Sequence, residues 1–172
     1  MAEEIPARPT DPWALLRLEQ TRGQALFGFA KRLGVSDAEA ADIVQESLVR
    51  VWEAMAAGVN VQNPVAMAFR IVHNLVMDQH RSTRRLRELL ENLAARRNEA
   101  GPSVDSVAES DIWLLVDRLP RRQRQVVYLR YAADLRFEEI GDVLGISPSA
   151  ARAHGSSAIS VLRTWLTTEA MT

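Results

Sequence analysis

The sequence predicts an all-α protein made of two small helical domains that a flexible linker joins. Signals for a helix N-terminus recur along the 172 residues, apolar residues follow them at helical spacing, and no strand-like alternation is present. Near the middle, the stretch RRNEAGPSVDSVAES is small and polar and contains Gly101-Pro102, so it has no core of its own. We therefore expect a first domain over 1–95, a linker over 96–109 and a second domain over 110–172.

Three helices are expected in the first domain. A capping side chain followed by proline (DP at 11–12 and NP at 63–64) starts the first and the third. Ser36 and Glu39 have the spacing of a capping box and start the second. Gly34 marks the end of the first helix. The expected helices cover 12–32, 36–57 and 64 to beyond 87.

Four shorter helices are expected in the second domain, over 111–118, 120–132, 137–144 and 147–166. The last two have the form of a helix-turn-helix. Gly145 tolerates the left-handed turn between them, and Ser147-Pro148 can start the second. Small residues at 151, 155 and 158 allow the two helices to pack closely. A plain helical hairpin is the alternative interpretation.

The charge balance argues against independent DNA binding. The net charge is −1 and the isoelectric point is about 6.3, whereas autonomous DNA-binding domains are usually basic. Either the chain does not bind DNA or a partner supplies the missing affinity. The sequence has no cysteine, no apolar run of membrane-spanning length and an acidic N-terminus unlike a signal peptide. We expect a cytoplasmic protein that needs no cofactor and does not bind a membrane.

The second expected helix has an apolar stripe and an acidic outer face. The stripe contains Val44, Leu48, Val51, Trp52 and Met55. The outer side carries Asp42, Glu46 and Glu53, with Val49 among them and Gln45 at its edge. The simpler interpretation is a solvated helix face. Carboxylates beside an exposed valine also suit a partner helix that carries arginine.

The third expected helix carries a basic stripe beside its apolar face. The stripe contains Arg70, Asn74, Arg81 and Arg85, with His73 beside it and Arg84 and Arg87 close by. Arginine neutralises phosphates, and asparagine and histidine can hydrogen-bond base edges. Composition alone does not separate a nucleic-acid-binding face from a solvated face paired with Glu88 and Glu91. The spacing of His73 and His80 does not indicate a metal site.

The last expected helix presents few cations. Its outward positions are small and uncharged: Ser149, Ala153, Ser156 and Ser160. Arg152 and His154 lie on the flanks of this face. Such a helix can enter a major groove but would be held there weakly.

Taken together, these stretches resemble the extracytoplasmic-function (ECF) group of bacterial RNA polymerase sigma factors. The segment DAEAADIVQESLVRVWEAM is similar to sigma region 2.2, and NPVAMAFRIVHNLVMDQHRSTRR is similar to regions 2.3 and 2.4. The segment LVDRLPRRQRQVVYLRYAADLRFEEIGDVLGIS is similar to region 4. The resemblance covers almost the whole chain except the extreme N-terminus and the linker. The order, the spacing and the absence of a region 3 domain carry the resemblance.

The resemblance implies a non-enzymatic subunit that binds core RNA polymerase and directs promoter-specific initiation. Polymerase would supply most of the DNA affinity, which explains how a chain of net charge −1 could act at a promoter. Docking on the clamp helices of the β′ subunit is implied for Asp42, Gln45 and Glu46, on the same outer face as Val49. The β flap, promoter DNA and an anti-sigma factor that binds between the two domains are the other implied partners.

The resemblance also implies which residues would contact promoter DNA. The loop over 57–63, with Asn60 and Asn63, would receive a base flipped from the non-template strand of the minus-ten element. The residues that would guide and melt this element are Arg70, His73, Asn74, Arg81, Arg84 and Arg85. The residues that would face the minus-thirty-five element are Ser149, Arg152, Ala153, His154 and Ser157, with Arg130 and Arg136 as phosphate contacts.

Several positions of the helix-turn-helix depart from the family pattern V-K-S-R-L-x-R-A. The departures are Ala151 for valine, His154 and Ser157 for arginine, and Gly155 for leucine. Glycine costs about 1 kcal/mol of helix propensity relative to alanine. Gly141 also stands where alanine is common. We expect minus-thirty-five binding that is weak or tuned to an unusual sequence.

Two other functions fit parts of the sequence. A helix-turn-helix regulator that binds an operator alone as a dimer would need a basic surface and a dimerisation helix, and neither is evident. A sigma-like decoy that binds polymerase or an anti-sigma factor without initiating would explain the modified recognition helix. An enzyme is disfavoured because the sequence has no Ser/His/Asp set, phosphate-binding glycine loop or metal-spaced cluster.

Overall fold

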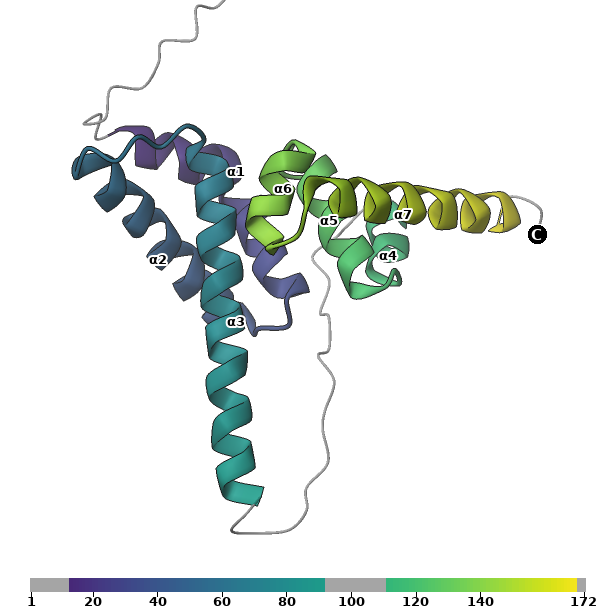
Figure 1. Cartoon of the computed structure of the whole chain (residues 1–172), viewed down its shortest axis with the longest axis horizontal. Coiled ribbons are helices and arrows are strands. Elements are labelled where there is room, and N and C mark those ends of the chain that lie inside the picture. Colours follow the sequence, from purple (N-terminus) through teal and green to yellow (C-terminus); the bar gives the residue numbers. More distant parts are fainter. Residues whose placement is uncertain (1–12, 92–110, 170–172) are drawn as a thin grey trace, which may run out of the picture.

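The structure is a computed structural model that describes residues 13–91 and 111–169, and all regular secondary structure in these ranges is α-helical (Figure 1). The all-α prediction is confirmed. The N-terminal bundle contains α1 (Trp13–Arg32), α2 (Asp37–Ala56) and α3 (Pro64–Glu91). The C-terminal bundle contains α4 (Asp111–Asp117), α5 (Arg121–Tyr131), α6 (Phe137–Leu144) and α7 (Pro148–Glu169). Asp11, Pro12 and the predicted linker over 96–109 lie outside the described residues.

The predicted start signals of α2 and α3 form the expected hydrogen bonds. The backbone N–H of Ser36 donates to a carboxylate oxygen of Glu39 at 2.8 Å, and the Glu39 N–H donates to the Ser36 hydroxyl at 3.4 Å. The hydrogen bond from the Ser36 side chain is the main reason that the pKa of Glu39 is lowered. At α3, the side-chain oxygen of Asn63 accepts from the N–H of Ala66 at 3.1 Å.

In the N-terminal bundle each pair of helices is in contact, and together the three bury an apolar core. Phe29 of α1 and Phe69 of α3 are fully buried and meet edge to face, with ring centroids 5.5 Å apart. Val51 of α2 is buried in the same apolar cluster, as its place in the predicted apolar stripe implies. Trp52 departs from the prediction: helical spacing put it in the apolar stripe, but its side chain is 47% exposed. Helix α2 packs against α1 and α3, and this contact leaves the Trp52 side chain half exposed.

The helix-turn-helix of the C-terminal bundle is formed by α6 and α7. Gly145 ends α6 in the left-handed conformation, with φ 65° and ψ 39°, as predicted. The Ser147 hydroxyl accepts from the N–H of Ala150 at 3.1 Å and so caps α7. A Cβ atom on Gly141 would lie 2.7 Å from the backbone oxygen of Ile146. The turn is therefore too tight for alanine at this position without a backbone shift.

The two bundles pack against each other, which the sequence did not predict. Helix α6 lies against α3, and α5 lies against α1. One apolar cluster runs without interruption from Phe29 and Val72 of the N-terminal bundle to Leu129 and Ile140 of the C-terminal bundle. The second half of α3 extends beyond both bundles (Figure 1). Within residues 13–91 and 111–169, no helix combines the length and the apolar character needed to cross a membrane.

Candidate nucleic-acid interface

The outer face of α2 combines carboxylates with exposed apolar side chains. All four residues predicted to dock a partner are exposed: Asp42, Gln45, Glu46 and Val49. Val49 is 45% exposed, and one turn later Trp52 is 47% exposed. Glu46 pairs with Arg50 at 2.7 Å, but both side chains are half exposed, so this pair adds little stability. Trp52 was predicted to belong to the apolar core stripe, but its exposed position beside carboxylates is typical of an interface anchor.

The loop between α2 and α3 places its two asparagines differently. Asn60 is exposed. Asn63 is half buried, because its side-chain oxygen caps α3 and its Nδ2 donates to Glu139 of α6 at 2.6 Å. One amide therefore uses both of its polar atoms, and one of the two bonds reaches the other bundle.

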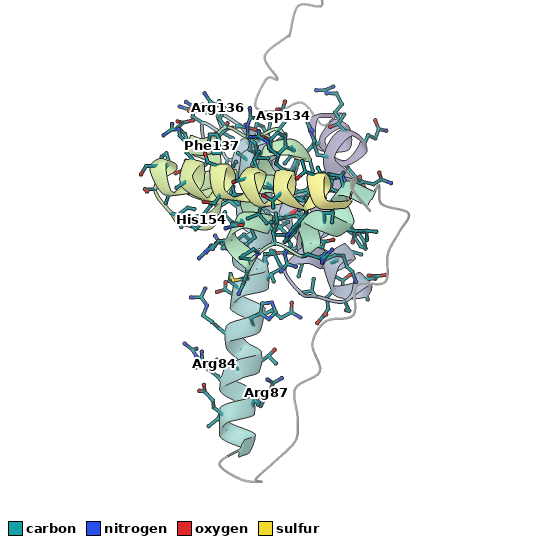
Figure 2. The ribbon with its side chains drawn as sticks, turned by 90° about the vertical axis from the view of Figure 1, so that its right-hand side faces the viewer. Arg84, Arg87, Asp134, Arg136, Phe137 and His154 are labelled. Carbon is teal, nitrogen blue, oxygen red and sulfur yellow. The ribbon has the colours of Figure 1, made fainter. Side chains whose placement is uncertain are left out.

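The cations of α3 form the continuous exposed stripe that the spacing predicted. Arg70, Asn74, Arg81 and Arg85 are exposed, as are the neighbouring Arg84 and Arg87. Arg81 pairs with Asp78 at 2.6 Å and Arg84 pairs with Glu88 at 2.8 Å, in solvent-exposed i,i+3 and i,i+4 pairs. Such pairs exchange easily for phosphate, because exposed pairs are worth less than about 1 kcal/mol. Arg84 lies on the part of α3 that projects from the body of the protein (Figure 2).

His73 is separated from this stripe by burial. It is only 9% exposed and lies under the C-terminal bundle. Burial lowers the pKa of His73, and the positive charges of Arg122 and Arg121 lower it further, against the opposing effect of a hydrogen bond with Asn74. His73 is therefore covered by the C-terminal bundle in this arrangement.

The recognition helix α7 presents a nearly neutral outer face. Ser149, Arg152, Ala153 and Ser157 are exposed, and His154 is half buried. Arg152 forms an ion pair with Glu138 of α6 and lies over the Phe137 ring, 5.9 Å from its centroid. Of the two predicted phosphate contacts, Arg136 directly precedes α6 (Figure 2). Arg130, near the end of α5, donates to the Leu135 carbonyl at 3.2 Å.

Comparison with known proteins identifies both bundles. Residues 20–86 match the model of sigma-70 region 2, and residues 110–159 match the model of sigma-70 region 4. The chain is similar to the ECF RNA polymerase sigma factor ShbA of Streptomyces griseus, with 32% identity over 131 residues that cover 71% of this chain and 69% of ShbA. The chain belongs to the ECF sigma factor family. The N-terminal bundle is therefore sigma region 2, and the C-terminal bundle is sigma region 4.

Two further matches extend over both regions. The ECF sigma factor SigL of Mycobacterium tuberculosis is 26% identical over 160 residues, which cover 87% of this chain and 88% of SigL. The sigma factor RpoE of Bartonella quintana, in its complex with the anti-sigma factor NepR, has the same fold, with a TM-score of 0.65 and 21% identity over 90% of this chain and 98% of that one. As an ECF sigma factor, the chain directs transcription initiation by RNA polymerase and is not an enzyme.

Proposed function

We propose that this sigma factor divides its task among three surfaces: the outer face of α2 binds the β′ clamp helices, α3 and the loop before it act on the minus-ten element, and α7 contacts the minus-thirty-five element. The observation that carries the proposal is the pair of unlike faces on region 2. An acidic and apolar face on α2 suits a protein partner, and an arginine stripe on α3 suits DNA. Because the whole chain has a net charge of −1, it needs a protein partner that supplies affinity for DNA as well as a basic face that contacts the DNA.

On α2, Asp42 and Glu46 would pair with cations of the clamp helices while Val49 and Trp52 bury apolar surface. Gln45 lies between them and can donate and accept hydrogen bonds. Charge complementarity speeds association and apolar anchors slow dissociation. Polymerase bound here would supply the DNA affinity that the chain lacks.

At the minus-ten element, the exposed Asn60 and the nearby Asn63 would hold a base extruded from the non-template strand. Extrusion costs a few kcal/mol, which contacts to the flipped base and to polymerase must offset. The arginines of α3 from Arg70 to Arg85 would hold the phosphates of the strand that leads to this base. Asn74 and His73 would lie closest to base edges.

At the minus-thirty-five element, α7 would enter the major groove with Arg152 as its main base-reading side chain. Ser149, Ala153, His154 and Ser157 would line the same face, and Arg130 and Arg136 would hold flanking phosphates. Since α7 offers few cations, its contribution would be sequence choice more than affinity.

The β flap is the proposed polymerase contact of region 4, and an anti-sigma factor is a further proposed partner. The complex of RpoE with NepR supports the second proposal, because that sigma factor of the same fold binds an anti-sigma factor. We infer a cytoplasmic location, because the proposed partners, core polymerase and promoter DNA, are found there. The small, uncharged face of α7 keeps one alternative open, a decoy that binds polymerase without initiating.

Run-off transcription tests the proposal. Purified core RNA polymerase is incubated with pooled genomic fragments of the host, with and without the protein. We expect new protein-dependent start sites that share upstream sequences. Core binding without new transcripts would favour the decoy. A gel shift by the protein alone, without core binding, would favour an independent regulator.

A further inference from the structure

A groove in region 4 lies between α5 and α7 and reaches the start of α6. Its volume is about 320 Å³, which is in the range of sites for small organic molecules. Helix α5 lines it with Arg130 and Tyr131, α6 with Phe137, and α7 with Ile159 and Arg163. All of these residues belong to region 4, so the groove does not depend on the contact with region 2.

Gly155 of α7 makes room for this groove. It is buried in the interior of a helix, where glycine is less favourable than alanine. A Cβ atom on Gly155 would lie 3.2 Å from Cε1 of Phe137 and 3.6 Å from Cγ1 of Val126. The Phe137 ring therefore packs directly on the backbone of α7. A larger residue at 155 would displace the ring or fill the groove.

The groove is positively charged. The described residues that line it include two arginines and no carboxylate. Arg130 is held in place, because its Nη1 donates to the Leu135 carbonyl at 3.2 Å and its guanidinium lies 5.8 Å from the centroid of the Phe137 ring. The ion pair with the exposed Asp134, at 3.6 Å, also uses Nη1. Both contacts leave Nε and Nη2 of Arg130 to bind a ligand.

Two further side chains of the groove have unused binding capacity. Arg163 is exposed, and no carboxylate of the described side chains pairs with it. Tyr131 is 62% exposed, and its hydroxyl has no hydrogen-bond partner among the described residues. An exposed ring can pack against a flat ligand, and a guanidinium can bind a carboxylate through two parallel hydrogen bonds.

The lining of the groove indicates one class of ligand. The two guanidinium groups favour an anion, whereas Tyr131, Phe137 and Ile159 favour a flat apolar body. An inorganic anion would leave this apolar surface uncovered. The volume favours a small molecule over a segment of a protein.

We propose that this groove binds a small aromatic carboxylate, whose ring packs on Tyr131 and Ile159 and whose charge is neutralised by Arg163 and Arg130. The binding site goes beyond the proposed function, which uses only Arg130, as a phosphate contact. A bound carboxylate would accept from the Nε and Nη2 donors that a DNA phosphate would otherwise use. The ligand and the minus-thirty-five element would therefore compete for Arg130.

Nuclear magnetic resonance of the full chain tests the site directly, with 2-naphthoate as the probe. We expect saturable shifts of the Gly155 amide and Ile159 methyl signals, and an affinity at least about tenfold higher than for neutral 2-naphthamide or inorganic phosphate. Absence of saturable shifts at these two residues would overturn the site. Equal affinity for 2-naphthamide would overturn the assignment of an anion, and equal affinity for phosphate would overturn the assignment of an aromatic ligand.

Arg163→Gln tests the charge of the site. It should weaken 2-naphthoate binding about tenfold, because a charge-assisted pair is lost. The fold should be unaffected, since Arg163 is exposed. Arg50→Gln removes an exposed arginine from α2 and is the matched control, with no expected change in affinity. Equal affinities of the two variants would contradict the pairing with Arg163.

Gly155→Ala tests the shape of the site. The new methyl group meets the Phe137 ring and should weaken 2-naphthoate binding severalfold. Gly23→Ala is the control, because its Cβ would meet only Glu19 Cγ at an ordinary 3.7 Å. Tyr131→Ala removes the exposed ring without changing the packing beneath the groove and should weaken binding to a similar extent. Unchanged binding in both groove variants would overturn the assigned site.

Competition with DNA is the regulatory consequence, and this step rests on the proposed function. At constant ionic strength, 2-naphthoate should weaken promoter binding by the wild-type holoenzyme and should have a much smaller effect on the Arg163→Gln holoenzyme. Binding of the probe without any effect on promoter binding would overturn the competition. A holoenzyme that binds no promoter with or without the probe, although the free protein binds the probe, would instead count against the proposed function.

Discussion

The two regions of this sigma factor offer DNA very unequal surfaces. Helix α3 of region 2 carries a run of exposed arginines from Arg70 to Arg85, whereas the exposed face of α7 in region 4 carries Arg152, which is paired with Glu138. Phosphate contacts supply most sequence-independent affinity. Under the proposed function, this difference predicts that region 2 and polymerase provide most of the affinity for DNA, and that region 4 contributes mainly choice among sequences.

The largest effect is expected where region 2 meets polymerase. Asp42→Arg with Glu46→Arg replaces two carboxylates by cations that face the cations of the proposed partner. We expect core binding to weaken by about 4 kcal/mol, roughly a thousandfold, measured by fluorescence anisotropy. Far-ultraviolet circular dichroism should stay unchanged because both side chains are exposed. Unchanged core binding would show that α2 is not the docking face.

The next effect concerns the arginine stripe. Arg81→Ala with Arg85→Ala removes two cations from α3, and promoter binding by the holoenzyme should weaken by about 2–3 kcal/mol. The salt dependence should also fall, by about 0.7–0.9 in slope for each lost phosphate contact. Arg17→Ala with Arg22→Ala removes equal charge from α1 and is the control. If both double variants lose the same amount of promoter affinity, the stripe contributes through net charge alone and not through specific phosphate contacts.

A third prediction concerns the turn that fixes α7 against α6. In Gly141→Ala the added methyl group would lie 2.7 Å from the Ile146 oxygen. We expect a net loss of about 1–2 kcal/mol in the free energy of unfolding, since overpacking costs more than alanine gains in helix propensity. Chemical denaturation measures this loss, with Gly23→Ala as the control. A stabilised Gly141→Ala variant would mean that the turn relaxes freely.

A fourth prediction adds a cation to α7, whose exposed face carries fewer cations than that of α3. Ser157→Arg places the residue that is usual in the family on an exposed position of α7. One additional phosphate contact should strengthen minus-thirty-five binding about threefold and steepen the salt dependence by about 0.9 in slope. Ser160→Arg adds the same charge to α7 outside the predicted contact set. Equal gains in the two variants would indicate non-specific attraction.

Local features of the fold were predictable from sequence because they depend on neighbouring residues. The Ser36 and Glu39 capping box, the left-handed Gly145 and the exposed stripe on α3 all follow from short-range pattern. Trp52 was misplaced because a helical wheel shows periodicity but not how wide a surface the neighbouring helices cover.

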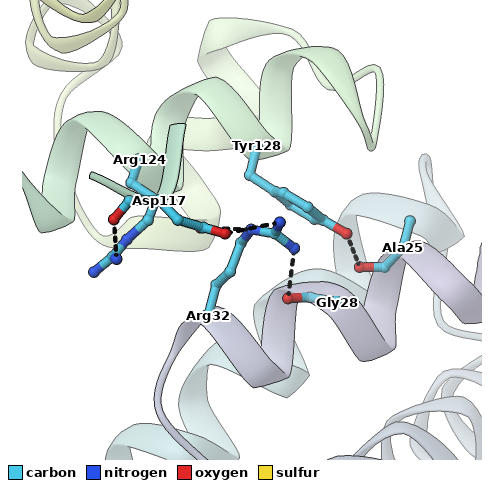
Figure 3. Close-up of polar contacts among 6 residues, drawn as sticks. All are labelled: Ala25, Gly28, Arg32, Asp117, Arg124 and Tyr128. Carbon is cyan, nitrogen blue, oxygen red and sulfur yellow. Dashed lines mark hydrogen bonds and ion pairs between the residues drawn. The ribbon is translucent and has the colours of Figure 1, made fainter. Parts of the chain in front are cut away.

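The contact between regions 2 and 4 could not be predicted from the sequence for a related reason. Arg32 of α1 and Asp117 of α4 form an ion pair across the two regions (Figure 3) although they are 85 positions apart, and neither residue differs in local pattern from an ordinary surface charge. The packing of region 2 against region 4 turns them into a buried pair. His73 likewise matched the DNA-binding stripe in spacing, while region 4 covers it in three dimensions.

The smallest predicted effect uses His73 to probe this contact. Because burial and the nearby Arg122 and Arg121 lower the pKa of His73 in the folded protein, the unfolded chain binds more protons below pH 6.5. Stability is therefore fully present above pH 6.5 and falls as the pH drops towards the lowered pKa. Glu39 and Glu139, whose pKa values are lowered from 4.5, keep their charge throughout this window.

We expect urea denaturation of the wild type to show a modest loss of stability between pH 7.5 and 5.5, and we expect His73→Gln to lose most of that dependence. His154→Gln, on α7, is the matched control. If region 4 covers His73 as described, Gly28→Ala should also weaken the pH dependence, since the added methyl group meets the Tyr128 hydroxyl of region 4 and an opened interface returns the imidazole to water. An unchanged pH dependence in Gly28→Ala, together with a larger radius of gyration by small-angle X-ray scattering, would mean that the burial of His73 does not come from region 4.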